Sequence, residues 1–184
     1  MQNDQQAARK AAVYEAALQL IGQGVSPAAL KIQQLADAAG IGKGTVYEYF
    51  SSKEEILQGL AEYCFARENE RIRAMFADCT TLAGLEERIT GYLQDIAASR
   101  MGSYKMGAMP ACMAELKEIV SELLARLQEA GEIAPELGME YCYMSLLSAV
   151  VGGLMGLCYA ADHDRTVKDL MDNLRLMIRR TLGK

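Results

Sequence analysis

Two short apolar runs separated by one glycine constrain the fold of this chain more than any other feature. In residues 32–39 the apolar side chains recur three and four positions apart, which is the spacing of one face of an α helix. Gly40 follows, and glycine can adopt the left-handed backbone that ends a helix and turns the chain. A second helix is predicted over residues 43–50, where Val46 and Phe50 share one side. The segment therefore predicts a helix-turn-helix. The apolar residues of its first helix are Ile32, Leu35, Ala36 and Ala39.

The second predicted helix leaves a polar side opposite Val46 and Phe50. A helix-turn-helix places its second helix in the major groove of DNA, with side chains of this face on the base edges. We therefore interpret the second helix as a recognition helix. Its outward residues are Lys43, Gly44, Thr45, Tyr47 and Glu48.

The same segment resembles a known family. The run GKGTVYEYFSSKEEIL, preceded by LADAAGI, is similar to the DNA-binding signature of the TetR family of transcriptional regulators, in which a Gly-Thr pair, an aromatic-x-aromatic-aromatic run and Ser-Lys-Glu occur together. The strong match covers residues 31–57, and residues 13–21 resemble that family's first helix. The resemblance implies an all-α chain, with a three-helix DNA-binding domain at residues 1–52 and a larger helical ligand-binding and dimerisation domain at residues 53–184.

The chain departs from this family pattern at the helix starts. Gly42 and Lys31 stand where the family often has a capping Ser or Thr, so capping is expected to be weaker by about 1 kcal/mol at each site. The connection after Gly24 is about two residues longer than usual. Ser26 followed by Pro27 is suited to start a short helical turn there.

Charge and placement select the residues that would contact DNA. The chain has a net charge of −5, and its first 55 residues carry five basic and six acidic side chains, a balance of −1. Affinity must therefore come from the position of each cation rather than from bulk charge. Glu48 has two open readings, an acceptor for a cytosine amino group or a solvent-facing partner of a nearby Lys. The predicted DNA-binding residues are Gln33, Lys43, Gly44, Thr45, Tyr47, Glu48, Tyr49 and Lys53, the last as a clamp on phosphate.

Helical spacing continues through the rest of the chain. With 184 residues, no Trp and only 3 Pro, the sequence favours long helices and no sheet. Residues 100–113, which contain two glycines, a proline and four methionines, are expected to form a short or broken helix. The other predicted helices cover residues 53–77, 82–96, 113–127, 141–161 and 167–178.

Residues 141–161 carry no charge, so they have two readings. By length they could cross a bilayer, which would make the chain a membrane-attached helical signalling protein. Three glycines interrupt the run and its ends lack clustered Lys or Arg, which favours a buried helix instead. Paired with the next helix across a two-fold axis, it would form a four-helix bundle, as the TetR resemblance also implies. The predicted dimer-interface residues are Leu146, Val150, Gly153, Leu154, Leu157, Leu170, Leu174 and Met177.

A small-molecule site is expected in the larger domain, because the resembled family binds effectors among these helices and thereby shifts the helix that begins at Lys53. Arg100 or Lys105 would anchor an anionic group. Such a Met and aromatic stripe is also typical of ordinary core. The candidate ligand-binding residues are Tyr92, Ile96, Arg100, Met101, Tyr104, Lys105, Met106, Met109, Met113, Tyr143, Leu147 and Met155.

Nothing in the sequence favours catalysis or a metal. The single histidine, His163, lies between Asp162 and Asp164, and three consecutive residues cannot easily converge on one ion. The five cysteines form no C-x-x-C pair and suit a reducing cytoplasm; Cys112 is either a redox sensor or an inert thiol. We expect no enzyme, no cofactor and no signal peptide.

These expectations combine into one function. The sequence predicts a cytoplasmic homodimeric regulator, a repressor by family resemblance, that binds a roughly palindromic DNA operator and is released by a small-molecule effector of unknown identity.

Overall fold

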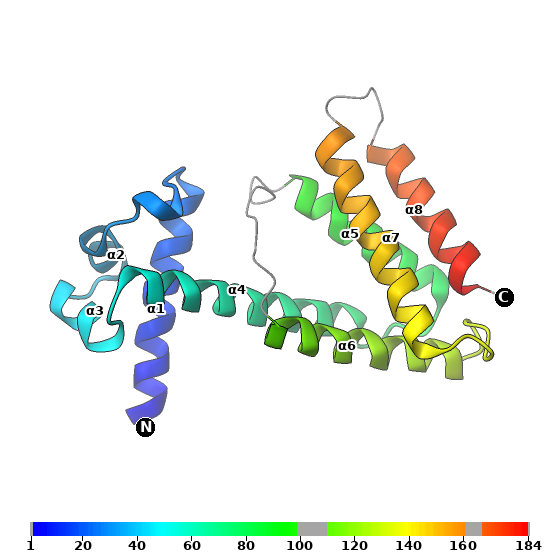
Figure 1. Cartoon of the computed structure of the whole chain (residues 1–184), viewed down its shortest axis with the longest axis horizontal. Helices are drawn as coiled ribbons and strands as arrows, with labels where there is room; N and C mark the ends of the chain where they lie inside the picture. The colour runs from blue at the N-terminus through cyan, green and yellow to red at the C-terminus, as the bar shows by residue number, and fades with distance from the viewer. Residues whose placement is uncertain (1, 99–109, 161–166, 184) are drawn as a thin grey trace. The chain divides into compact units, whose positions relative to one another are not determined.

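The computed structural model describes residues 2–98, 110–160 and 167–183, and the regular structure in these ranges is helical, with no strand. This part of the chain forms eight α helices and one 3-10 turn, and Figure 1 labels the α helices. Their bounds are α1 (Gln2–Gly22), η1 (Pro27–Ala29), α2 (Ile32–Ala39), α3 (Lys43–Tyr49), α4 (Lys53–Phe76), α5 (Leu82–Ala98), α6 (Pro110–Glu129), α7 (Met139–Ala160) and α8 (Val167–Leu182).

The helix order confirms the all-α prediction. The extra turn predicted after Ser26 is η1, with Pro27 at its first position. One prediction is wrong in part: residues 110–113, expected within a broken segment, belong to α6, which begins at Pro110. Proline lacks an N–H group and has a helical φ, so it suits a first turn in which that N–H would have no helical partner. The rest of that segment, residues 100–109, lies outside the described residues.

The contacts divide the chain into two units, Met1–Glu68 and Asn69–Lys184, and the division falls inside α4. The boundary expected from the sequence, between residues 52 and 53, marks instead the point where α4 begins. The reason for the later division is that the first turns of α4 supply Ile56 and Leu60 to the core of the first unit. Each unit has its own apolar core.

In the first unit, α1 packs against α2 and α3. The centre of this core contains Val13, Leu35, Val46 and Ile56, all with no exposed surface. The helical spacing that predicts the two sides of α2 and α3 is thereby confirmed. The buried residues of this core cluster are Val13, Ala17, Leu30, Leu35, Ala36, Val46, Phe50, Ile56 and Leu60.

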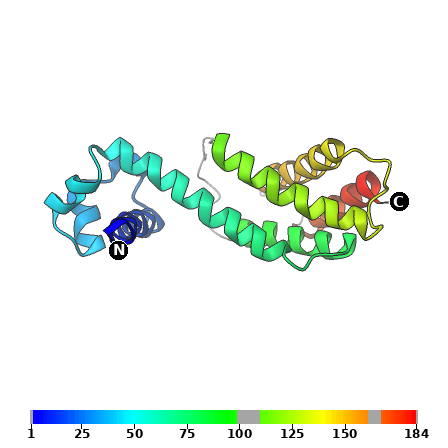
Figure 2. The same ribbon diagram turned by 90° about the horizontal axis from the view of Figure 1, so that it is seen from below.

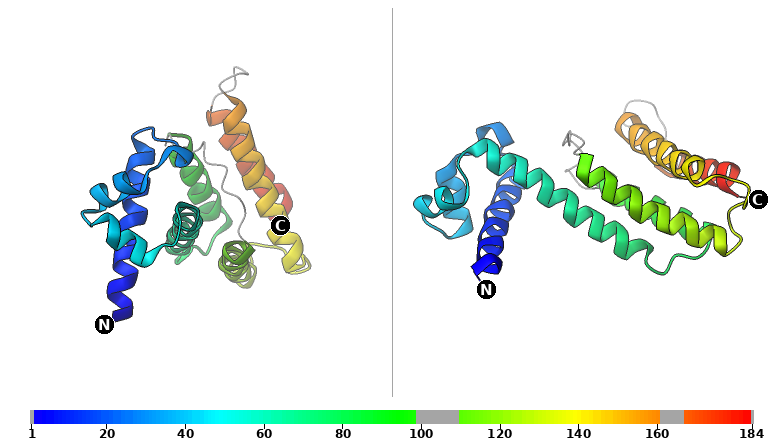
Figure 3. Two further views of the ribbon diagram at one scale, coloured as in Figure 1. Left: turned by 60° about the vertical axis from the view of Figure 1, so that its left-hand side comes forward. Right: turned by 60° about the horizontal axis from the view of Figure 1, so that its bottom comes forward.

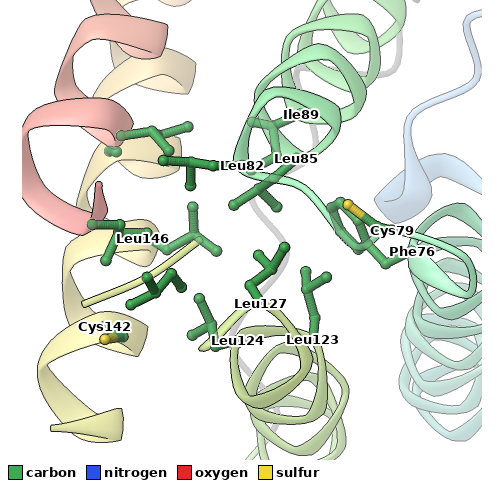
Figure 4. Packing of buried hydrophobic residues seen from close by; sticks show 14 of the residues in the cluster. Phe76, Cys79, Leu82, Leu85, Ile89, Leu123, Leu124, Leu127, Cys142 and Leu146 are labelled. Carbon is green, nitrogen blue, oxygen red and sulfur yellow. The ribbon is translucent and has the colours of Figure 1, made fainter. Parts of the chain in front are cut away.

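The second unit is built around α5, α6, α7 and α8. Figure 2 and the right-hand view of Figure 3 show α7 running beside α8, and α8 also packs on α5. Leucines of α5 and α6 point toward one another in the centre of this unit, with Leu146 of α7 completing the layer (Figure 4). The side chains of Leu85, Leu123, Leu124 and Leu127 have no exposed surface.

Hydrogen bonds and an ion pair join the helices of the second unit at their ends and along α8. The N–H of Leu82, which starts α5, donates to Glu132 Oε2 at 2.9 Å, and Arg126 donates to the carbonyl of Phe76 at the end of α4 at 2.6 Å. On α5, the buried carboxylate of Glu86 accepts from Arg179 Nε of α8 at 2.7 and 2.9 Å. This bond to the carboxylate raises the pKa of Arg179 and keeps the buried charge of Glu86 paired.

Candidate nucleic-acid interface

The turn of the helix-turn-helix depends on the backbone of Gly40. This residue has φ 65° and ψ 30°, the left-handed conformation that costs a residue with a Cβ atom about 1 kcal/mol or more. The N–H of Ile41 then donates to the carbonyl of Ala36 at 3.0 Å, which closes the end of α2. The prediction of a glycine-dependent turn is confirmed, and the turn leads directly into α3.

The short helix α3 has one buried and one exposed side. Val46 is fully buried and Phe50, which follows the helix, is 2% exposed, whereas Tyr47 is 53% exposed. A large aromatic side chain with half of its surface in water gains little from packing in the free protein. The exposed side of α3 is therefore available to a partner.

The structure brings most of the predicted DNA-binding residues to this exposed side. Thr45 and Tyr49 are half-buried, and Tyr49 packs part of its ring on the core. The side-chain amide of Gln33, on α2, donates to Asp37 of the same helix at 2.8 Å. The exposed members of the set are Gln33, Lys43, Gly44, Tyr47 and Glu48.

Lys53 occupies a different environment from the other predicted contacts. It is the first residue of α4 and is half-buried, and its Nζ donates to the carbonyl oxygen of Ala28 in η1 at 2.8 Å. The two residues are 25 positions apart, so this bond joins the start of α4 to the turn that precedes α2.

The capping expected to be weak is weak in the structure. Neither Gly42 before α3 nor Lys31 before α2 caps its helix through its own side chain. At α2, the side chain of Gln34 compensates in part, because its Oε1 accepts from the backbone N–H of Lys31 at 3.2 Å. At α4 a side chain does cap the helix, since Ser52 Oγ accepts from the N–H of Glu55 at 3.1 Å.

The side chain of Glu55 in turn accepts a backbone hydrogen bond from the junction between α3 and α4. Its Oε2 accepts from the backbone N–H of Ser51 at 2.6 Å. This bond favours the ionised carboxylate and so lowers the pKa of Glu55 from its ordinary value. A group with a lowered folded-state pKa contributes stability above its unfolded pKa, and this contribution is lost as the pH falls through the folded pKa.

We expect the first unit to lose part of its stability in acid through Glu55. In a series of thermal unfolding curves below pH 5, Glu55→Gln should show a weaker pH dependence than the wild-type chain, because the glutamine does not titrate. Glu54→Gln, on the exposed surface of the same helix turn, serves as the matched control and should keep the wild-type dependence. Equal slopes for all three proteins would contradict the role assigned to Glu55.

The sequence analysis did not predict a polar and aromatic cluster between α1, α4 and Phe50, the residue that follows the recognition helix α3. The ring of Tyr14 on α1 packs edge-on against Phe50, with centroids 5.5 Å apart, and tilted on Tyr63 of α4 at 5.3 Å. The Tyr63 hydroxyl donates to Glu15 at 2.6 Å, which raises the pKa of Tyr63, and Arg67 pairs with the same carboxylate. These contacts hold α1 on α4. No specific signal in the sequence pointed to these contacts, because they join residues of two different helices, α1 and α4.

The candidate effector residues are only partly placed. Tyr92 and Tyr143 lie under cations, with Arg71 Cζ 5.3 Å from the first ring and Lys117 Nζ 5.3 Å from the second. Ile96, Leu147 and the half-buried Met113 remain predictions. Met155 is 51% exposed on α7, so the structure does not place it in an interior site. The candidates that lie outside the described residues are Arg100, Met101, Tyr104, Lys105, Met106 and Met109.

A cavity of about 260 Å³ opens on α8, lined by Asp172, Arg175, Leu176 and Arg179. None of the candidate effector residues lines it. Its charges are already engaged, since Arg175 pairs with Asp172 at 3.0 Å and Arg179 with Glu86. The cavity therefore does not have the character of an effector pocket, which is mostly apolar.

The predicted dimer residues require a correction. Leu146 is 4% exposed and Leu174 is 2% exposed within the single chain, because both belong to the core of the second unit. A Cβ atom on Gly153 would lie 3.1 Å from Leu93 and 3.5 Å from Leu174, so this glycine serves the crossing of α7 over its own α5 and α8. The half-buried Val150, Leu154, Leu157 and Leu170 also pack on this core. Of the predicted set, Met177 is the strongly exposed member.

Other large apolar side chains of the same hairpin face outward. On α7 they follow one stripe three and four residues apart, with Ser148 between them, and α8 carries two further exposed apolar side chains. This outward stripe consists of Tyr141, Met144, Val151 and Met155 on α7 with Leu176 and Met177 on α8. We call it the hairpin stripe.

Over Met139–Leu157, helix α7 has the length and apolar composition of a membrane span, and 28% of that window is buried within the chain. Length and composition alone are weak evidence for a span. In the described ranges no group of three His, Cys, Asp or Glu side chains could hold a metal ion. Burial raises the pKa of the thiols of Cys64, Cys79 and Cys142, which makes them less reactive. Asp162, His163 and Asp164 lie outside the described residues.

Known proteins share both the motif and the fold. Residues 13–60 match the sequence profile of bacterial regulatory proteins of the tetR family. A TetR-family transcriptional regulator from Pectobacterium atrosepticum superposes with a TM-score of 0.76 at 18% identity, covering 98% of this chain and 97% of that one. A tetR-family regulator from Shewanella sp. PV-4 has a TM-score of 0.63 at 20% identity, covering 96% and 98%.

A third similar structure is that of the transcriptional regulator FadR from Bacillus subtilis in complex with stearoyl-CoA, with a TM-score of 0.60 at 17% identity and coverage of 93% and 96%. No curated protein sequence matches the chain. The matched profile contains the whole helix-turn-helix described above, and the structural likeness extends over both units. Residues 13–60 therefore carry the DNA-binding domain of the tetR family, and the chain as a whole has the fold of TetR-family transcriptional regulators.

Proposed function

We propose that this chain is a homodimeric, ligand-responsive repressor that binds a roughly palindromic operator through α3 and leaves it when a small molecule binds the second unit. The observation that carries the proposal is the two-sided α3. Val46 and Phe50 fix it to the core, while Tyr47 is 53% exposed and its neighbour Glu48 is exposed. A short helix held in this way can enter a major groove without unfolding its support.

The proposed contacts on DNA divide by chemistry. Lys43 approaches phosphate through its charge, and Thr45, Tyr47 and Tyr49 offer hydroxyl groups to phosphates or base edges. Gln33 is a weaker candidate because its amide already donates to Asp37. Glu48 is exposed and forms no ion pair in the described part of the chain, which favours its role as an acceptor for a cytosine amino group.

Gly44 gives a prediction that separates folding from binding. Gly44→Ala should stabilise the first unit by about 0.5–1 kcal/mol, because alanine loses less backbone entropy in a helix. A Cβ atom at Gly44 meets nothing within 4 Å in the free protein. On DNA the same methyl group would stand between the backbone and a phosphate, so operator affinity should fall about tenfold or more. Chemical denaturation and fluorescence anisotropy measure the two effects.

The matched control for Gly44 is Gly91 on α5, where an added Cβ atom also meets nothing within 4 Å. Gly91→Ala should give a similar gain in stability and leave operator affinity unchanged. If Gly44→Ala bound the operator as tightly as the wild-type chain, α3 would not approach the DNA backbone at this point.

The hairpin stripe is the proposed dimer surface. Several large apolar side chains exposed along one face of a helix are often covered by a partner. A homodimer that joins two such hairpins about a two-fold axis would bury the stripe and carry two reading helices. Two half-sites one turn apart would then require the two α3 helices to stand about 34 to 36 Å apart in the DNA-binding form.

An effector in the second unit is supported by the fold. The Bacillus subtilis regulator with the same architecture holds stearoyl-CoA. For this chain we propose a small molecule of unidentified class among α5, α6 and α7. Release of DNA requires that it bind the released form more tightly, since equal affinity for both forms shifts no equilibrium.

The experiment that tests the proposal is selection of bound duplexes from random DNA by the purified full chain, followed by a screen for small molecules that release them. We expect a palindromic consensus bound by a dimer. A second reading, attachment to a membrane through α7, rests on its apolar window. Sedimentation of the chain with lipid vesicles and absence of any selected duplex would support that reading and contradict ours.

A further inference from the structure

The cation at Lys53 has a partner inside the protein. Within η1, the N–H groups of Ala29 and Leu30 donate to the carbonyls of Ser26 and Pro27, at 2.9 and 3.3 Å. The carbonyl of Ala28 is turned toward Lys53 instead, with Nζ at 2.8 Å. A donor with a full positive charge forms a stronger bond than a neutral donor. The start of α4 therefore holds the extra turn of this chain in place.

The held turn leads directly into α2. Leu30 follows η1 and is buried in the core of the first unit, and Lys31 precedes the first residue of α2. The backbone of Lys31 is extended, with φ −111° and ψ 141°, and its N–H is fixed by Gln34 Oε1. The bond of Lys53 to Ala28 and the burial of Leu30 thus fix the chain just before Lys31, and Gln34 fixes the backbone of Lys31 itself.

The side chain of Lys31 is exposed, unlike that of Lys53. In the part of the chain that the structure describes, no carboxylate pairs with it. Lys10 differs again, because its Nζ lies 5.4 Å from the centroid of the Phe50 ring. Lys31 and Lys43 are therefore two exposed cations at the starts of the two helices of the helix-turn-helix, on a unit whose first 55 residues carry a net charge of −1.

From these contacts we infer that Lys53 is a positioning residue, which holds η1 through the Ala28 carbonyl, and that Lys31 is the cation that contacts the DNA backbone at the start of α2. The inference rests on the proposed DNA binding and changes one expected contact. Lys53 acts on DNA through the turn and not through a phosphate. The extra residues after Gly24 supply the carbonyl that makes this possible.

Salt dependence distinguishes the two lysines. Each phosphate contact that is lost lowers the slope of log K against log salt by about 0.9, or about 1.8 for a dimer that loses two. With the selected operator and the full-length chain, Lys31→Ala should show this change. Lys53→Ala should bind about tenfold more weakly at every salt concentration while its slope stays that of the wild type. Lys117→Ala, at a paired surface lysine of the second unit, is the matched control and should alter neither quantity.

A conservative variant and a measurement without DNA complete the test. Lys53→Gln keeps a hydrogen-bond donor and loses the charge, so it should recover part of the affinity at the wild-type slope; it also carries the test if Lys53→Ala fails to fold. Hydrogen exchange of the Ala29 and Leu30 amides should accelerate in Lys53→Ala and not in Lys31→Ala.

Three results would overturn the inference. They are a lower slope for both Lys53 variants, an unchanged slope for Lys31→Ala, and unchanged exchange of the η1 amides in Lys53→Ala. A wild-type chain that binds no duplex would overturn the proposed function and the Lys31 contact together. A wild-type chain that binds its operator, with any of the three contrary results in the variants, would overturn only the inference.

Discussion

Val151→Glu is expected to convert the dimer into monomers and to abolish tight operator binding. Val151 is 46% exposed at the middle of the stripe on α7, between Met144 and Met155. Burying an unpaired carboxylate against apolar side chains costs about 3 kcal/mol or more, and a two-fold interface would contain two of them. Dimerisation should weaken at least about 100-fold, and a monomer with one reading helix should lose a further factor of about 100 or more on a palindrome.

Analytical ultracentrifugation and anisotropy with the selected operator measure these two losses. Gln94→Glu adds the same charge to the exposed surface of α5, away from the hairpin stripe, and should leave both the dimer and the affinity unchanged. Circular dichroism should show a folded monomer, because Val151 does not belong to the buried core of its own chain. A dimeric Val151→Glu protein would show that two chains meet elsewhere.

The reading helix could be predicted from the sequence because its constraints are local. Gly40 is required by a left-handed backbone, and the burial of Val46 and Phe50 follows from helical spacing inside a run of twenty residues. The same holds for the cap at Ser52, which needs only the neighbouring Glu55. Local patterns of this kind fix both the elements and the side of each that faces inward.

The hairpin was harder to predict because its first helix, α7, is apolar on most sides. Spacing alone could not tell that Leu146 and Leu174 face their own chain while Val151 and Met155 face outward. That choice depends on where α5 lies, which is set by contacts such as that of Leu93 with the Gly153 side of α7. The bond of Lys53 to Ala28 could not be predicted for a similar reason, since the two residues are 25 positions apart.

Two aromatic side chains, one on α3 and one directly after it, provide the second large effect. Phe50→Ala should destabilise the first unit by about 3–5 kcal/mol, because the ring is 2% exposed and packs against Tyr14, and its removal leaves a cavity. Such a loss is a large part of the stability of a small unit, so its unfolding should become a separate transition at lower temperature in calorimetry. Operator binding should disappear with it.

Tyr47→Ala, three residues earlier, removes a similar ring from the exposed side of α3. Because 53% of Tyr47 is in water, the unfolding transition should stay within about 0.5 kcal/mol of the wild type. Operator affinity should nevertheless fall at least about tenfold, since the ring and its hydroxyl would be lost from the groove. The expected pair of results is thus loss of binding with intact folding for Tyr47→Ala, and loss of folding for Phe50→Ala. This pair is required of a helix that is anchored on one side and contacts DNA with the other. A Tyr47→Ala protein that binds the operator as tightly as the wild type would remove this side chain from the interface, and a Phe50→Ala protein with unchanged stability would contradict the packing that holds α3.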